Sequence, residues 1–211
     1  MSPRSRLFLL LCLVASLPLC LVSQDTGAAR DAWQRPQEVM DALGISAGSS
    51  VADVGCGDGY FTFHLAERVG LAGHVYAVDI DEGALKKLRQ KAEKEKLTQI
   101  ETVVGAADDP RLEPESVEVV LIVNAYHEMR DYDAMLAALF RALKPGGRLA
   151  IIDGAIENGQ KRESYFERHR IPKEVVREEA EGHGFVFWRE EKGFTRTHDS
   201  KRFYFLVFEK P

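Results

Sequence analysis

The 211-residue chain is predicted to form an α/β domain around a mostly parallel, seven-stranded sheet with helices on both faces. Three observations predict this class. Apolar Val51–Val54 runs directly into a glycine-rich turn, as a buried parallel strand does before its crossover helix. Val117–Val123 is continuously apolar, which is typical of a strand buried on both faces. Phe185–Glu190 and Arg202–Glu209 alternate or run apolar and predict two further strands near the C-terminus.

The first strand leads into glycines at positions 55, 57 and 59, and an apolar helix follows. The second strand, Val75–Asp79, ends in a carboxylate. A strand, a glycine turn, a helix and a second strand ending in an acid bind nucleoside-bearing cofactors at the carboxyl ends of parallel strands. Glycines let the backbone approach such a ligand without a Cβ in the way.

The details favour S-adenosylmethionine over a dinucleotide. A dinucleotide fingerprint would need a third glycine where this chain has Tyr60. Asp53 precedes Gly55 by two residues; its carboxylate would repel a pyrophosphate but could accept a hydrogen bond from an ammonium group. Asp79 could accept both ribose hydroxyls. A ligand-free tight turn and an NAD-dependent oxidoreductase stay as less favoured alternatives.

This segment resembles motif I and the acidic second motif of the class I S-adenosylmethionine-dependent methyltransferases. Within that family, its motifs look similar to those of the ubiquinone/menaquinone C-methyltransferases. The resemblance covers roughly residues 31–209 and implies a Rossmann-like fold, in which the closing pair of strands near the C-terminus includes one antiparallel strand. It implies that Asp53 and the glycines line the methionine end of the cofactor, that Asp79 holds the ribose and that Asp108 contacts the adenine. Asn124, at the end of the fourth strand, completes the cofactor-binding candidates, which are Asp53, Gly55, Gly57, Gly59, Asp79, Asp108 and Asn124.

The other elements follow from the apolar pattern and its breakers. In Lys144-Pro145-Gly146-Gly147, the proline ends a helix and the glycines allow the reversal into the next strand. The remaining predicted strands are Gln99–Val104 and Arg148–Asp153, and the remaining predicted helices are Asp133–Leu143 and Pro172–Glu181.

Groups that activate the methyl acceptor should follow the fourth strand. His127 is the leading candidate for a general base, because histidine exchanges protons near neutrality, and Glu128 could orient it or act itself. The alternative is that His127 only caps the strand or packs against the adenosine. His169 is more simply a surface histidine, and Trp33 either covers the cofactor or packs in the core. No group of residues has the sequence spacing of a metal site.

The amino terminus resembles an export signal. Arg4 and Arg6 precede the apolar run Leu7–Val22, so residues 1–23 are predicted to be a signal peptide or a membrane anchor. The methyltransferase domain, residues 31–211, would then be exported, periplasmic or secreted, or anchored through residues 7–22. Cys12 and Cys20 fall in this segment and leave Cys56 alone in the domain.

The formal charge of −5 and the lack of a basic cluster argue against a nucleic-acid partner. The segment Lys86–Lys91 is basic, but glutamates flank it, so it is predicted to be a solvent-exposed helix face rather than a binding patch. The sequence therefore predicts transfer of a methyl group from S-adenosylmethionine to a small-molecule acceptor. The alternative hypothesis is an exported domain that binds the cofactor without catalysis.

Overall fold

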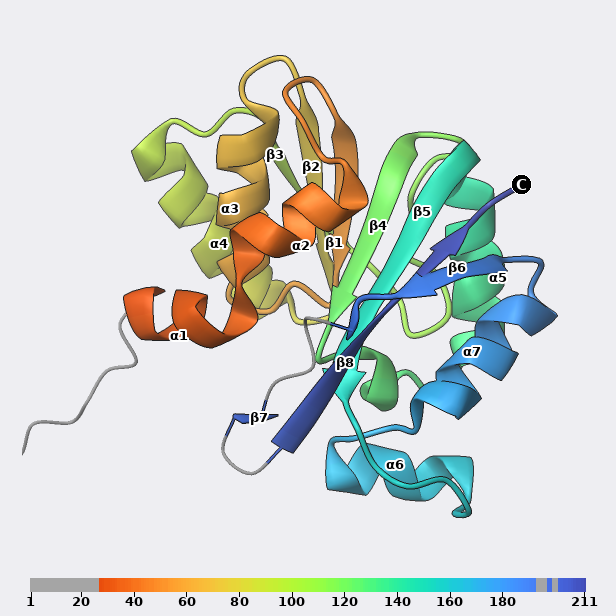
Figure 1. Ribbon diagram of the computed structural model, residues 1–211. Helices are drawn as coiled ribbons and strands as arrows, with labels where there is room; N and C mark the ends of the chain where they lie inside the picture. The colour runs from red at the N-terminus through yellow and green to blue at the C-terminus, as the bar shows by residue number, and fades with distance from the viewer. Residues whose placement is uncertain (1–26, 193–196, 199–200) are drawn as a thin grey trace, which may run out of the picture.

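A mostly parallel sheet between two layers of helices forms the core of the structure, a computed structural model that describes residues 27–192, 197–198 and 201–211 (Figure 1). The strands are β1 (Ser50–Val54), β2 (His74–Asp79), β3 (Ile100–Val104), β4 (Val117–Val123), β5 (Leu143–Gly154), β6 (Val186–Glu190), β7 (Thr197–His198) and β8 (Lys201–Glu209). The helices are α1 (Gly27–Gln34), α2 (Pro36–Leu43), α3 (Tyr60–Val69), α4 (Glu82–Glu95), α5 (Tyr132–Ala142), α6 (Arg162–Arg168) and α7 (Lys173–Gly182), with a 3₁₀ turn, η1 (Tyr126–Glu128). The predicted signal segment, residues 1–23, lies outside the described residues.

The strand order is β3-β2-β1-β4-β5-β8-β6, with the two-residue β7 paired to β8 outside this path. Neighbours from β3 to β5 are parallel, while β8 is antiparallel to both β5 and β6. The predicted seven-stranded Rossmann-like sheet with one antiparallel strand is thereby confirmed. The chain order reverses between β1 and β4, and in open α/β sheets the crevice at such a reversal is where ligands bind.

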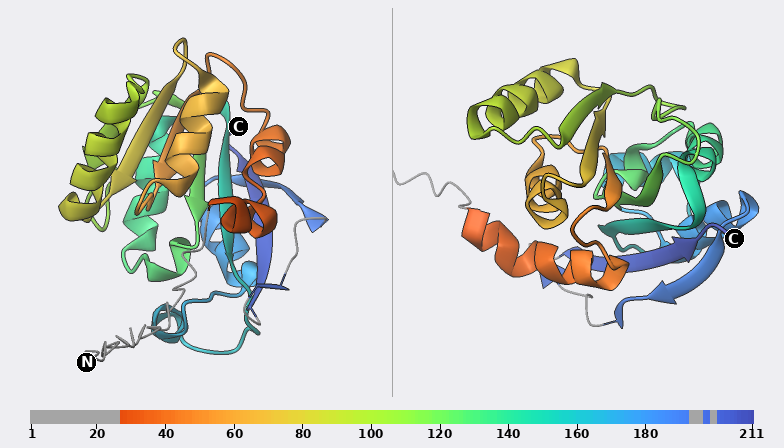
Figure 2. Two further views of the ribbon diagram at one scale, coloured as in Figure 1. Left: turned by 90° about the vertical axis from the view of Figure 1, so that its left-hand side faces the viewer. Right: turned by 90° about the horizontal axis from the view of Figure 1, so that it is seen from above.

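One face of the sheet is covered by α2 and α3. Their apolar side chains, among them Met40 and Leu65, pack on Val51, Leu121 and Val207. The next helix, α4, continues this layer toward β3. Seen from above, α1 to α4 lie along one side of the sheet and α5 and α7 along the other (Figure 2).

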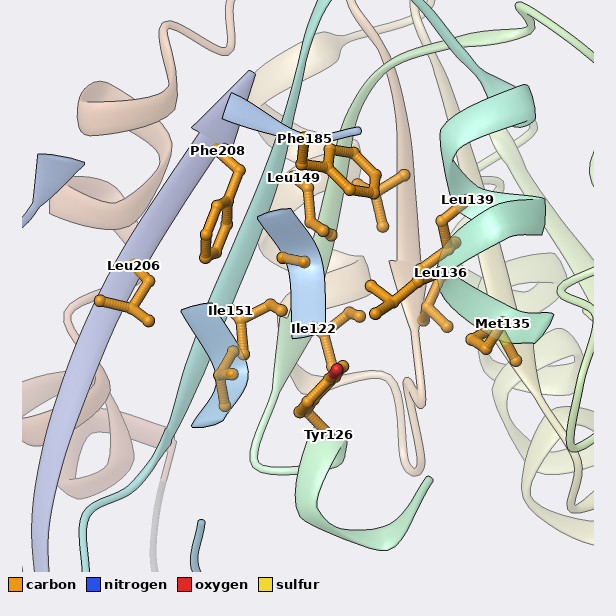
Figure 3. Close-up of a cluster of buried hydrophobic side chains, with 14 of the residues drawn as sticks. Ile122, Tyr126, Met135, Leu136, Leu139, Leu149, Ile151, Phe185, Leu206 and Phe208 are labelled. Carbon is orange, nitrogen blue, oxygen red and sulfur yellow. The ribbon is translucent and has the colours of Figure 1, made fainter. Parts of the chain in front are cut away.

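The opposite face carries the larger cluster of buried side chains. Leu136 and Leu139 of α5 pack on Ile122 and Ile151 of the central strands, and Phe208 extends the cluster along β8 (Figure 3). Alternate residues of the central strands thus belong to the two clusters on opposite faces of the sheet. Both faces of β4 are therefore buried, which explains why its sequence is almost continuously apolar. Among the described residues, no helix is long and apolar enough to cross a membrane.

The boundary between α5 and β5 differs slightly from the prediction. The sequence predicts a turn at residues 144–147 and a strand from Arg148, whereas β5 already begins at Leu143. The pairing of β4 with β5 is irregular between Val117 and Val119, and Gly146 adopts a φ of 73°. The reversal is therefore built into an irregular start of the strand rather than into a separate loop.

Candidate active site

A pocket of about 450 Å³ opens at the carboxyl ends of β1, β2, β3 and β4, at the reversal of strand order. Its lining comes from the glycine turn, the ends of β2 and β3, the segment after β4, and single residues of α5 and α6. The lining residues are Val54, Gly55, Gly57, Val78, Asp79, Ile80, Gly105, Ala106, Ala107, Asn124, Ala125, Glu128, Met129, Arg130, Asp131, Met135 and Phe166. In Figure 1 this is the lower edge of the sheet, on the side where α6 lies.

The glycine turn and Asp79 hold each other in place on one wall. The Gly57 N–H donates to Asp79 Oδ2 over 2.8 Å, and the Asp81 N–H donates to Asp79 Oδ1 over 2.9 Å. Behind them, the N–H groups of Gly55 and Cys56 donate to the carbonyl of Val78. Each carboxylate oxygen accepts one of these backbone hydrogen bonds and has a second lone pair, so Asp79 can accept from two vicinal hydroxyl groups.

Asp53 lies deeper, at 3% exposure, and accepts a hydrogen bond from Thr62 Oγ1 at 2.6 Å. Burial raises the pKa of its carboxyl to about 6, against the lowering effect of the Thr62 hydrogen bond, and the negative charge of Asp79 raises it further. Asp53 is outside the set of lining residues. Its predicted contact with the methionine end of the cofactor stays a prediction.

The other cofactor candidates divide between the pocket and its surroundings. Asn124 lines the pocket and adopts a left-handed φ of 53°. Asp108 is exposed and follows Ala107, a lining residue. Gly59 stands at the start of α3, where a Cβ would come within 2.6 Å of Leu88, so its local task is helix packing.

His127 forms a buried pair with Asp153, the last residue but one of the neighbouring strand β5. The side chains are 1% and 0% exposed, and His127 Nδ1 lies 2.8 Å from Asp153 Oδ1. The His127 N–H also donates to Asp153 Oδ2 over 3.0 Å, and the Gly154 N–H donates to Asp153 Oδ1. Since Asp153 can accept the Nδ1 proton, the arrangement leaves the Nε2 lone pair of a neutral ring available.

Glu128 lines the pocket, whereas His127 is behind it. Glu128 Oε1 lies 3.6 Å from His127 Nε2 and 3.5 Å from Nδ1 of His169, which ends α6. The His127 and His169 rings meet edge to face with centroids 5.5 Å apart. His169, expected to be a surface histidine, has a 58% exposed side chain but shares Glu128 with His127.

Neither the pairing of Asp153 with His127 nor the closeness of His169 to Glu128 was predicted from the sequence. The signal for Asp153 was present: it ends a predicted strand that would pair with the strand before His127, and carboxyl ends of parallel strands meet at one sheet edge. His169 follows a loop and a short helix, so its approach depended on tertiary packing that the pattern of residues does not encode.

Arg162 of α6 holds η1 from the outside. Its guanidinium donates to the carbonyls of Tyr126, His127 and Met129 over 3.1 to 3.5 Å and to Glu179 Oε1 over 2.9 Å. The Tyr126 hydroxyl donates to the other Glu179 oxygen over 2.7 Å. Burial raises the pKa of Glu179, opposed by the Tyr126 hydrogen bond and by Arg162.

Trp33 lies beside this region without lining the main pocket. Its ring packs 5.4 Å from that of Phe203, and both line a small hollow together with Asn124. Asn124 lines the main pocket as well, so the small hollow beside Trp33 and the main pocket share this residue.

Residues 51–147 match a family described as a methyltransferase domain. A demethylmenaquinone methyltransferase of Listeria welshimeri is 33% identical over 126 residues, covering 60% of this chain and 52% of that protein. The chain therefore spans about half the length of the curated relatives of this kind.

The fold is shared with solved structures. An S-adenosylmethionine-dependent methyltransferase from Aquifex aeolicus superposes with a TM-score of 0.72 at 24% identity, covering 87% of this chain and 93% of that one. The cyclase SpnF superposes with a TM-score of 0.71 at 16% identity, covering 86% and 82%. Because a protein named as a cyclase has this fold too, the fold alone does not choose the reaction.

Proposed function

We propose that this protein binds S-adenosylmethionine and transfers its methyl group to a small-molecule acceptor. One observation carries the proposal: the glycine turn, Asp79 and Glu128 line the same pocket. One wall is suited to a nucleoside, and the other brings a proton acceptor within the same space. The family match of residues 51–147 supports the same reading.

The pocket residues fit such a cofactor. Gly57 lines the pocket, and a Cβ built there would meet no protein atom within 4 Å, so the backbone is bare on that side. Gly55, Gly57, Asp79 and Asn124 would hold the cofactor, with Asp108 at the edge beside Ala107. The cofactor supplies an electrophilic sulfonium methyl, so the protein's own task is to place and deprotonate the acceptor.

Glu128 is the residue that performs this task, with His127 behind it. Glu128 reaches the pocket, where its carboxylate accepts a proton or a hydrogen bond from the acceptor. Nε2 of His127, 3.6 Å from the carboxylate, is a second acceptor for that proton, and Asp153 fixes the ring from the other side. Arg162 keeps η1, and with it both side chains, at the pocket.

The acceptor we propose is of modest size and lipophilic, methylated at oxygen, nitrogen or carbon. Phe166, Met129 and Met135 line the pocket together with several small apolar residues. The name of the Listeria relative, a demethylmenaquinone methyltransferase, points to the same kind of compound. A water-soluble naphthoquinol therefore belongs in a first acceptor panel, beside simple phenols, thiols and amines.

Calorimetric titration of the full chain with S-adenosylmethionine, S-adenosylhomocysteine and NAD tests the cofactor. We expect micromolar binding of the two sulfur nucleosides, none of NAD, and at least tenfold weaker binding by Asp79→Ala. Glu95→Gln, at the far end of α4, is the matched control and should bind as the parent does. Folded protein that binds neither sulfur nucleoside would overturn the proposal, and preference for NAD would favour an oxidoreductase.

Release of S-adenosylhomocysteine with the acceptor panel, in the presence of EDTA, tests catalysis. With a productive acceptor, Glu128→Gln should lower kcat by about 10²-fold or more while cofactor affinity stays unchanged. The same loss in His127→Gln would support its part in accepting the proton. Cofactor binding without transfer to any acceptor, and no effect of either variant on binding, would instead support a non-catalytic binding domain.

The location of the protein is a separate part of the proposal. Residues 1–23 act as a signal peptide or as an anchor, and residues 31–211 form the exported methyltransferase domain. The basic residues before an apolar run support this. Fusing residues 1–30 to a reporter that is active only outside the cytosol tests it: an active fusion is expected, and an inactive one with Arg4 and Arg6 intact would contradict it.

A further inference from the structure

Three metal-ligating side chains converge at the edge of the pocket, although their sequence spacing gave no sign of it. His127 and Glu128 come from η1 and His169 from the end of α6. One ligand atom from each lies within 4.8 Å of the other two. We propose that these three residues form a binding site for a divalent transition-metal ion such as Zn²⁺.

The separations suit a single ion. Glu128 Oε1 lies 3.6 Å from His127 Nε2 and 3.5 Å from His169 Nδ1. Tetrahedral Zn²⁺ with bonds of about 2.0–2.2 Å places neighbouring ligand atoms about 3.3–3.6 Å apart. The two separations from Glu128 match this spacing, and the two imidazole nitrogens lie within 4.8 Å of each other, a separation that the exposed side chain of His169 can adjust.

The state of His127 is an independent indication. Its ring is 1% exposed, yet Nε2 has no hydrogen-bond partner among the described residues. A buried polar atom without a partner costs free energy, and a bound ion would supply the missing partner. The other ring nitrogen, Nδ1, already faces the carboxylate of Asp153 at 2.8 Å. A carboxylate behind a histidine in this way orients metal-ligating histidines and strengthens their binding.

The ligand types select the metal. Two imidazoles and one carboxylate suit Zn²⁺ and its neighbours and do not suit Mg²⁺ or Ca²⁺, which prefer oxygen ligands. Three protein ligands also leave at least one position of the ion open, as in catalytic rather than structural zinc sites. Glu128 belongs to both the cluster and the pocket, so the open position would be available to an acceptor oxygen.

Metal binding goes beyond the proposed methyl transfer and can fail independently of it. The ion would use the same Nε2 lone pair that accepts a proton in the metal-free reaction, so the two forms of the site exclude each other. The catalytic assay in EDTA therefore tests the metal-free form, and titration with metal tests the metal site directly.

The test is titration of the EDTA-treated, desalted full chain with Zn²⁺ by calorimetry and with Co²⁺ by visible absorption. We expect one ion per chain and Co²⁺ bands of tetrahedral or five-coordinate type. His169→Gln and Glu128→Gln change exposed side chains and should leave the domain folded, and each should weaken metal binding at least tenfold. His74→Gln is the matched control, because His74 also lies beside a carboxylate, Glu101, at 3.0 Å.

Loss of binding in the two cluster variants with retention in His74→Gln supports the site. No stoichiometric binding by the folded parent, equal affinity in His169→Gln, or a comparable loss in the His74 control overturns it. Titration of the same samples with S-adenosylmethionine separates the two proposals, because intact cofactor binding without metal binding removes only the metal site.

Discussion

A Cβ added to Gly55 would lie 2.6 Å from the Cβ of Ala125, so the turn after β1 and the segment after β4 touch at the floor of the pocket. Gly55 also has a φ of 75°, in the left-handed region that glycine tolerates best. The contact fixes the distance between the wall that carries Asp79 and the segment that leads to Glu128. Neither residue can enlarge without moving the two walls apart.

Gly55→Ala is expected to destabilise the protein by about 2–4 kcal/mol, the sum of left-handed backbone strain and overpacking. Gly57→Ala, at a φ of 54° but with no atom within 4 Å of the new Cβ, should cost only about 1 kcal/mol. Urea unfolding of the variants measures both. Adding Ala125→Gly to Gly55→Ala should restore part of the loss, and an additive double variant would show that the contact is unimportant.

Asp53→Asn is expected to stabilise the folded protein at about pH 8. Burial raises the pKa of the Asp53 carboxyl from 3.8 to about 6, so between these values the unfolded chain releases a proton that the folded chain keeps. The penalty starts near the lower value, grows as pH rises, and is complete above the higher one, at about 3 kcal/mol. An asparagine avoids it and can still accept the Thr62 hydrogen bond.

The measurement for Asp53 is the free energy of unfolding of parent and variant at about pH 8 and about pH 4.5. The stabilisation by Asp53→Asn should shrink strongly at the lower pH, where the parent carboxyl is protonated in the folded state. Glu95→Gln controls for the change in net charge. A variant that is less stable than the parent at about pH 8 would contradict the sign of this argument.

Arg162→Met should cost about 1–3 kcal/mol of stability, because three carbonyls of the η1 segment lose a charged donor and Glu179 loses its ion pair. It should also lower methyl transfer more than cofactor binding, since η1 carries His127 and Glu128. Arg177→Met removes an exposed pair with Glu181 and the cation–π contact with Phe187, and it should change stability by at most about 1 kcal/mol while leaving methyl transfer unchanged. Equal effects of the two variants would refute a special role for Arg162.

Cys56 is expected to resist alkylation in the folded protein. It is 7% exposed, and burial, followed by the charge of Asp53, raises the pKa of its thiol far above the ordinary value. Brief iodoacetamide treatment followed by peptide mass spectrometry should leave Cys56 unmodified in buffer and modify it in urea. Rapid modification in buffer would show that the glycine turn opens readily.

The sheet was predictable because its strands are short, apolar and ended by glycine, proline or acidic residues. The predicted strands after β1 coincide with β2 and β4 to within a residue, since β4 is apolar throughout and β2 ends at Asp79. The start of β5 was not predictable to the residue. There the Pro145 and Gly146 turn pairs with neighbouring strands in an irregular register, which depends on contacts between distant segments.

The cofactor end of the site was more predictable than the acceptor end. Gly55, Gly57 and Asp79 follow one another along a single strand–turn–helix–strand unit, so local pattern was enough to bring them to one pocket wall. The pairing of His127 with Asp153 joins two neighbouring strands. The contact of His169 with Glu128 joins the end of α6 to η1 across 41 positions of the numbering, and only the packed structure reveals it.

The place of β8 has a consequence for how the protein is made. This strand, Lys201–Glu209, is the last of the described strands to leave the ribosome, yet it lies between β5 and β6 in the sheet. Until it emerges, β5 has an unpaired apolar edge open to other chains. The sheet can close only after synthesis has passed residue 209, and until then the unfinished chain exposes this strand edge to aggregation.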